Sequence, residues 1–106
     1  MQLVLVNTPP KYGDTWWTDN IIYMLKGKLD IDKVHIIKDI EFGGVYDKLR
    51  IFQIFKNPNT QYLYLDLDVL IKNDIRHLLK KEFTLLHAWW RKPAHTPLNS
   101  SIMSWF

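Results

Sequence analysis

Short apolar runs alternate with polar segments along this chain, and their spacing predicts its secondary structure. Apolar runs at residues 3–6, 34–37 and 62–67, the second containing His35 and the third Asp66, are typical of strands buried in a mostly parallel sheet. Two further elements are expected near the end, a strand over residues 83–89 and another element that begins at Ser100. The segment 91–97, with two prolines, is predicted to be a loop.

Two segments whose apolar residues follow helical spacing lie between the three predicted strands. The first helix is expected to begin at Asp14 or Thr15 and to end at Gly27 or just after it. The second helix is expected to begin with Asp47 as its cap and to end before the segment 57–59. The apolar positions that should face the core are Trp17, Ile21, Met24 and Leu25 in the first helix, and Leu49, Phe52 and Phe55 in the second. A third, short helix is predicted over residues 75–81.

Strands that alternate with helices predict a βαβαβ arrangement, so the expected fold class is α/β with a mostly parallel central sheet. The length of 106 residues fits one domain over residues 1–106. Ligands of such sheets bind at the carboxyl ends of the strands. The polar groups that follow the three predicted strands are Asn7 and Thr8, Asp39, and the pair Asp66 and Asp68.

Asp66 and Asp68 are the most informative residues of the chain, because they interrupt a run in which every neighbour is apolar. Burying an unpaired charge costs several kcal/mol, on the order of the stability of a small domain. Residues two apart on an extended chain point the same way, so both carboxylates can meet one divalent cation. The alternative is a turn at the end of the strand with two exposed carboxylates.

The charge and composition narrow the classes of partner. The net charge of +3 comes from dispersed basic residues, which fits an anionic small ligand and no nucleic acid. There is no cysteine, so a disulfide or thiolate metal site is excluded. The apolar stretches are too short for a membrane span, and the N-terminus lacks the features of a signal peptide. We therefore expect a cytoplasmic protein.

The segment 64–69, Tyr-Leu-Asp-Leu-Asp-Val, resembles the Asp-X-Asp signature of the GT-A class of nucleotide-sugar glycosyltransferases. Three other segments agree with that class in order. They are the Lys-Leu-Arg-Ile-Phe helix at 48–52, similar to glycogenin and galactinol synthase, and the segments 73–78 and 98–103. The resemblance implies the Rossmann-like nucleotide-binding half of a GT-A fold and a metal-dependent transferase of the hexosyltransferase type.

The resemblance also implies a donor, a metal and residue roles. The donor would be a nucleoside-diphosphate sugar, with a UDP-sugar expected, and the metal Mn²⁺ or Mg²⁺. Asp66 would reach the ribose or a metal-bound water, and Asp68 would bind the metal that bridges the diphosphate. The expected nucleotide-binding residues are Thr8, Pro9, Tyr12, Asp39, Lys48, Asp66 and Leu67, and the expected sugar-binding residues are Asn99 and Ser100.

The chain also departs from the family pattern. Related transferases supply a further metal ligand, often a histidine, and an acceptor-binding subdomain from a segment that would follow Phe106. The acceptor is therefore unknown, and the chain is either a minimal form of the enzyme or is completed by a homo-oligomer or another partner. The alternative is a nucleotide or nucleotide-sugar binding module without catalysis. A phosphatase of the haloacid-dehalogenase type is disfavoured, because its Asp-X-Asp stands near the N-terminus.

Overall fold

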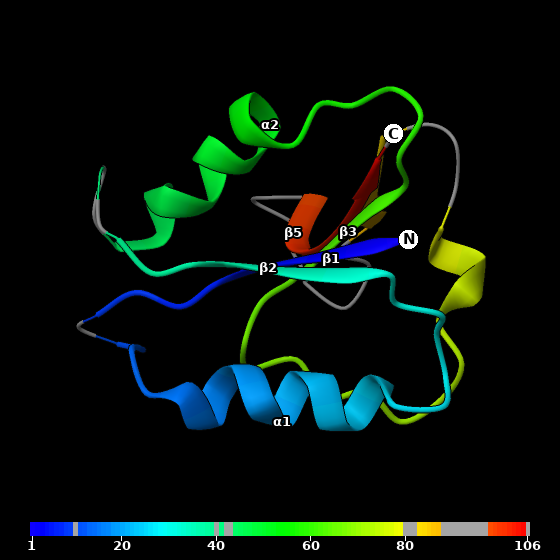
Figure 1. The fold of residues 1–106 in the computed structure, drawn as a ribbon, viewed down its shortest axis with the longest axis horizontal. Helices are drawn as coiled ribbons and strands as arrows, with labels where there is room; N and C mark the ends of the chain where they lie inside the picture. Colours follow the sequence, from blue (N-terminus) through cyan, green and yellow to red (C-terminus); the bar gives the residue numbers. More distant parts are fainter. Residues whose placement is uncertain (10, 40, 42–43, 80–82, 88–97, 106) are drawn as a thin grey trace.

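The computed structural model describes residues 1–9, 11–39, 41, 44–79, 83–87 and 98–105, which form an α/β domain around one sheet (Figure 1). The sheet has five strands in the order β2-β1-β3-β5-β4. The strands are β1 (Gln2–Val6), β2 (Lys33–Ile37), β3 (Tyr62–Leu65), β4 (Thr84–His87) and β5 (Leu98–Trp105). The helices are α1 (Thr15–Leu25), α2 (Ile51–Ile54) and the 3-10 helices η1 (Gly44–Arg50) and η2 (Arg76–Leu78).

The core of the sheet is parallel, and its outer part is mixed. β1 lies between β2 and β3 and runs parallel to both, which confirms the predicted βαβαβ order. β5 then lies between β3 and β4 and is antiparallel to each of them. The element predicted from Ser100 is therefore the reversed strand of the sheet, and it begins at Leu98.

Two apolar layers cover the sheet, one on each face. Figure 1 shows α1 on one side of the strands and α2 on the other. The layer beneath α1 contains Leu3, Leu5, Ile21, Leu25, Leu63, Leu65, Leu67 and Ile71. The layer beneath α2 contains Val4, Ile37, Ile51, Phe55, Tyr62, Tyr64, Met103 and Trp105. Adjacent residues of β1 and β3 belong to opposite layers, as the strand period requires.

The first helix forms as its sequence predicts. The Asp14 side chain accepts a hydrogen bond from the Trp16 backbone N–H at 2.8 Å, so Asp14 caps the helix. Ile21 and Leu25 are buried in the core, and Trp17 and Met24 pack against it. Gly27 has φ of +77°, a conformation that glycine adopts readily, just after the last helical turn.

The second helical segment differs from the prediction. The 3-10 helix η1 begins at Gly44, so Asp47 lies inside it and does not cap an α-helix. A 3-10 helix has 3.0 residues per turn rather than 3.6, so the side that faces the sheet changes. Leu49 is consequently exposed and Ile51 is buried, whereas Phe52 and Phe55 pack against the core as expected.

Three other boundaries also differ. β3 ends at Leu65 because the chain turns at Asp66, so the prediction of a strand through residue 67 is wrong at its end. The helix expected over residues 75–81 is the short η2, and its last two positions lie outside the described residues. The fourth strand ends at His87 in the described part of the chain, and the loop predicted over 91–97 lies outside it.

The burial in α2 supports a test of the second apolar layer. Ile51 is 0% exposed and Ile54 is 51% exposed, although both are isoleucines of the same short helix. We expect Ile51→Ala to lower the free energy of unfolding by about 2–5 kcal/mol, because it leaves a cavity beneath the helix. Ile54→Ala should change it by less than about 0.5 kcal/mol. Urea denaturation followed by circular dichroism measures both, and equal losses would contradict this packing.

Candidate functional site

The carboxyl ends of β1, β2 and β3 meet at one edge of the sheet, because the three strands are parallel. Thr8, Asp39 and Asp66 follow these ends and therefore lie along the same edge, as predicted. β1 is the middle strand, so Asp39 and Asp66 lie on opposite sides of it. The edge thus has one part near β2 and another near β3.

The Asp-X-Asp segment forms a turn rather than an extended strand. The Asp66 N–H donates to the Ser101 carbonyl of β5 at 2.8 Å, and the Asp66 carbonyl accepts from the Val69 N–H at 3.2 Å. Leu67 points into the core and is buried. The expectation that an extended strand points both carboxylates the same way is therefore wrong, because a turn over residues 66–69 positions them, as in the alternative of a turn at the strand end.

One oxygen of Asp66 has a hydrogen-bond donor and an ion-pair partner. The hydroxyl of the buried Tyr64 donates to Asp66 Oδ1 at 2.5 Å, and Lys48 Nζ lies 3.5 Å from the same oxygen. Burial raises the pKa of Tyr64 well above its usual value, and the negative charge of Asp66 raises it further. The Tyr64 hydroxyl therefore stays protonated and donates to Asp66. Lys48 comes from η1, so the structure brings together the predicted residues Lys48 and Asp66.

Asp68 is more exposed than Asp66, with 55% of its side chain accessible against 27%. Its carboxylate lies 3.8 Å from Lys11 Nζ, in the segment between β1 and α1. The hydrogen bond with Tyr12 raises the pKa of Lys11, and the charge of Asp68 raises it further. Lys11 was not among the predicted site residues; its place in the segment after the first strand is the signal that could have identified it.

The segment after β1 is held by Asn7. Its buried side chain donates to the Asp14 carbonyl at 2.9 Å and accepts from the Gly13 N–H at 2.7 Å. Gly13 has φ of +128°, which a residue with a side chain rarely adopts. Asn7 therefore maintains the conformation of the segment that carries Lys11 and Tyr12.

The predicted nucleoside residues of this segment lie in different environments. Thr8 is buried, and its carbonyl accepts from the Tyr12 N–H at 3.2 Å. Pro9 is exposed. Tyr12 is half-buried, and its ring meets that of Trp17 edge to face at 4.9 Å between centroids. The segment thus presents a polar backbone and part of one aromatic ring at the same edge as Asp66.

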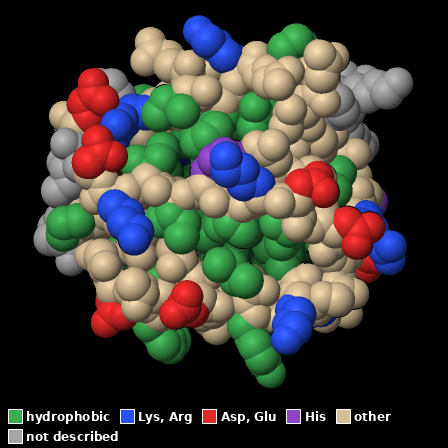
Figure 2. Space-filling view, viewed as in Figure 1, with side chains coloured by type: hydrophobic (Ala, Val, Ile, Leu, Met, Phe, Trp, Pro, Cys, Tyr) green, Lys and Arg blue, Asp and Glu red, His purple; other side chains and the backbone are tan. Residues whose placement is uncertain are grey.

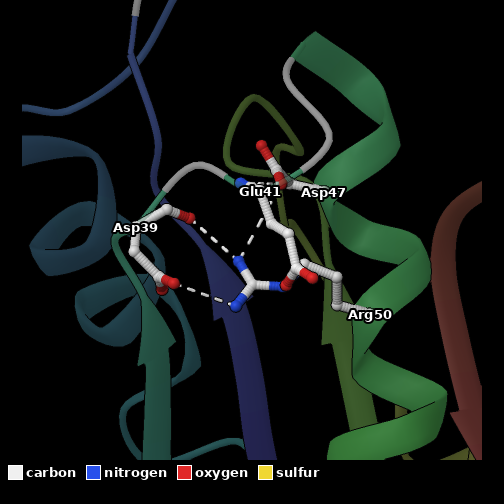
Figure 3. A network of polar contacts seen from close by, with 4 residues as sticks. All are labelled: Asp39, Glu41, Asp47 and Arg50. Carbon is white, nitrogen blue, oxygen red and sulfur yellow. Dashed lines mark hydrogen bonds and ion pairs between the residues drawn. The ribbon is translucent and has the colours of Figure 1, made fainter.

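Asp39 belongs to an ion-pair network around Arg50 (Figure 3). The guanidinium donates to the Asp39 carboxylate and to its carbonyl, each at 2.9 Å, and its Nε lies 2.9 Å from Glu41. Asp47, which is completely buried, lies 3.9 Å from Arg50 and accepts from the Glu41 N–H at 2.9 Å. Arg50 was not among the predicted site residues, and its contacts with Asp39 join η1 to the end of β2.

The predicted sugar-binding residues lie on β5. The register pairs Leu65 with Ile102, and the Asp66 N–H donates to the Ser101 carbonyl, so Ser101 lies directly opposite Asp66. Ser100 is the next residue along the strand and is half-buried. Asn99 lies in β5 opposite Leu86, but its side chain is outside the described part. β5 therefore runs past the turn that contains the carboxylates.

Asp66 and Asp68, the predicted metal ligands, are two carboxylates that follow the end of β3. No group of three or more histidine, cysteine, aspartate or glutamate side chains around a common point occurs among the described residues. Mg²⁺ and similar hard cations prefer oxygen ligands and are often held by one or two carboxylates, the remaining positions being taken by water and substrate phosphates. The donor set of Asp66 and Asp68 fits a divalent cation of this kind.

The rest of the surface is mixed. In Figure 2, basic and acidic side chains are interspersed over the face that is seen, and hydrophobic side chains lie between them. An open depression of about 200 Å³ lies between α1 and β2, at the opposite edge from Asp66, and is lined by Gly27, Lys28, Leu29, Asp30 and Arg76. No helix within the described ranges is long and apolar enough to cross a membrane.

Comparisons with known proteins were made for the whole chain. No family model matches it, and no curated protein and no solved structure match it either. What this edge of the sheet can do is therefore inferred from its geometry and chemistry.

The burial of Asp47 leads to a stability prediction. Asp47→Ala removes the acceptor for the Glu41 N–H and the buried charge beside Arg50. We expect the free energy of unfolding to fall by about 2–4 kcal/mol. Asp39→Ala, which truncates a carboxylate that is 74% exposed, should have a smaller effect in the same urea titration. A larger loss for Asp39→Ala would contradict this network.

The network also predicts a titration. The hydrogen bond from Arg50 lowers the pKa of Asp39 below its ordinary value of 3.8. Since the pKa is lower in the folded state, the ion pair stabilises the protein above pH 3.8, and this contribution is lost as the pH falls through the lowered pKa. Carboxyl ¹³C NMR should show the pKa of Asp39 returning toward 3.8 in Arg50→Gln. An unchanged pKa would exclude Arg50 as the cause.

Proposed function

We propose that the chain is the nucleotide-binding part of a metal-dependent glycosyltransferase that uses a nucleoside-diphosphate sugar, with a UDP-sugar as the donor. One observation carries the proposal. The turn with Asp66 and Asp68 lies at the carboxyl end of the central strand β3, between Lys48 of η1 and Lys11 of the segment after β1. This is where an open α/β sheet binds nucleotides. A Rossmann-like, GT-A-type arrangement is part of the same proposal.

The metal would be held by Asp68, with Asp66 beside it. Asp68 is half-exposed, and its only ion pair among the described residues is the 3.8 Å contact with an exposed lysine, so its oxygens are accessible to a cation. Asp66 is oriented by Tyr64 through Oδ1, which leaves Oδ2 to accept from a ribose hydroxyl or a metal-bound water. When bound, Mn²⁺ or Mg²⁺ would neutralise negative charge on the departing diphosphate.

The nucleotide would lie along the edge between β1 and β3. Tyr12 and Pro9 supply apolar surface to a base, and Thr8 and Leu67 form the floor between the two strand ends. Lys48 supplies a positive charge to the diphosphate. Asp39 contributes less directly, because its carboxylate binds Arg50 and thereby ties η1 to the end of β2.

The sugar would be directed toward β5. Asn99 and Ser100 remain candidates for contacts with it, since β5 passes the carboxylate turn. The surface that binds the acceptor would be supplied by a partner or by a second copy of the chain. A binding module without catalysis would bind the metal and the nucleotide sugar in the same way but would not transfer the sugar. Release or transfer of the sugar in the presence of acceptors therefore distinguishes the transferase from the binding module.

The proposal is tested by calorimetric titration of UDP with and without Mn²⁺. We expect Mn²⁺-dependent binding of UDP in the wild type and its loss in Asp68→Ala, because that substitution removes a metal ligand. The variant should still fold, because the substitution also removes repulsion between the two carboxylates. Removing one charged ligand should weaken the Mn²⁺-dependent affinity by at least about tenfold.

Asp19→Ala is a matched control, since Asp19 is an exposed aspartate of α1 that is not part of this edge. Its binding should equal that of the wild type, and circular dichroism should show that both variants are folded. The absence of UDP binding in both conditions would exclude the transferase and the binding module together. Unchanged Mn²⁺ dependence in Asp68→Ala would exclude Asp68 as the ligand.

A further inference from the structure

Each carboxylate of the turn faces an ammonium group from a different segment. Lys48 Nζ lies 3.5 Å from Asp66, and Lys11 Nζ lies 3.8 Å from Asp68. Both separations exceed the usual range of about 2.7–3.2 Å for a direct hydrogen bond. The two lysines therefore neutralise the carboxylates as loosely held counterions, which a stronger cation can replace.

Each of these lysines also lies over a tyrosine ring. Lys11 Nζ is 5.2 Å from the centroid of Tyr12, and Lys48 Nζ is 5.8 Å from that of Tyr64. An ammonium group within about 6 Å of a ring centroid is attracted by the face of the ring. The rings thus give both ammonium groups a second partner, so a lysine that loses its carboxylate stays at the edge of the sheet.

The charges of this group of four side chains cancel. Asp66 and Asp68 contribute two negative charges, and Lys11 and Lys48 contribute two positive charges. Adding a divalent cation would leave two positive charges in excess. The diphosphate of a nucleotide sugar is a diester with two negative charges, so it would restore neutrality.

We infer that Lys11 and Lys48 are exchangeable counterions of the Asp66–Asp68 turn, which a divalent cation releases so that they bind the diphosphate. The inference rests on the proposed function and deepens it, because it makes cation and diphosphate binding mutually dependent. The cation takes over the carboxylates, and the same two ammonium groups then turn from Asp66 and Asp68 to phosphate oxygens. Each ligand favours the binding of the other, as linkage requires.

This exchange predicts that removing one ammonium group changes the affinities for Mn²⁺ and for UDP in opposite directions. Removing either ammonium group removes a competitor for the carboxylates, so Mn²⁺ alone should bind more tightly. The same substitution removes a cationic partner of the phosphates, so UDP should bind less tightly when Mn²⁺ is saturating. A lysine that only supports the fold would give neither the tighter Mn²⁺ binding nor the weaker UDP binding.

The test measures Mn²⁺ binding to the full chain without nucleotide, from the electron paramagnetic resonance signal of free Mn²⁺. Lys48→Met and Lys11→Met keep the unbranched apolar stem of the side chain and remove its ammonium group. Each should tighten Mn²⁺ binding by about two- to fivefold, the range expected for loss of one partly exposed ion pair. Lys56→Met is the matched control, because Lys56 is an exposed lysine just beyond α2, and it should leave the affinity unchanged.

A second titration adds UDP at saturating Mn²⁺. Each of the two variants should bind UDP about tenfold more weakly than the wild type, as expected for loss of a charge-assisted contact. Unchanged or weaker Mn²⁺ binding in both variants would overturn the exchange, while Mn²⁺-dependent UDP binding by the wild type would keep the proposed function. If the wild type binds neither Mn²⁺ nor UDP, the proposed function fails and the exchange fails with it.

Discussion

The negative charge at the end of β3 is the constraint on which the rest of this edge depends. β3 is paired on both sides, and the backbone of Asp66 is fixed by its hydrogen bond to β5, while Leu67 is held in the core. The backbone at the start of the turn is therefore fixed, and the negative charge of Asp66 and Asp68 stays at this edge of the sheet. Other elements supply the compensation, namely the Tyr64 hydroxyl, Lys48 from η1 and Lys11 from the segment after β1.

The Arg50 network does not contact Asp66 directly but positions the helix that carries Lys48. Arg50 and Lys48 belong to the same 3-10 helix, and Arg50 binds Asp39 at the end of β2 and approaches the buried Asp47. A buried carboxylate is tolerated where hydrogen bonds and an opposite charge satisfy it. The network thus determines where η1 lies against the sheet, and through the helix it determines how closely Lys48 approaches Asp66.

The elements that the sequence predicted correctly are those with a local signal. The parallel strands β1, β2 and β3 are continuous apolar runs, and α1 combines a capping Asp14 with helical spacing. η1 was misplaced because a 3-10 helix shares the composition of an α-helix while exposing Leu49 and burying Ile51. The sequence contains no pattern that indicates the change from about 3.6 to about 3.0 residues per turn.

Long-range pairing had no local signal at all. The reversal of β5, which inserts between β3 and β4, depends on pairing with β3 at residues 62–65. The apolar runs of both strands are compatible with either direction. Arg50 had no signal in the pattern of strands and helices either, although its partners precede it by only eleven, nine and three residues. Lys48 and Asp66, both predicted site residues, lie close together at the end of β3, whereas the contact between Lys11 and Asp68 came only from the structure.

The different surroundings of Asp66 and Asp68 support different roles for the two carboxylates. Asp66 Oδ1 accepts from the buried Tyr64 hydroxyl and faces Lys48, so one of its two oxygens is already committed to the protein. Breaking the buried contact would leave a phenol without an acceptor, which costs more than giving up a water. Asp68 faces only Lys11 among the described ion pairs, at a longer distance and with more than half of its side chain exposed. A cation that binds carboxylate oxygens would therefore obtain them from Asp68 at lower cost, and Asp66 would be suited to orient a neighbouring hydroxyl or water.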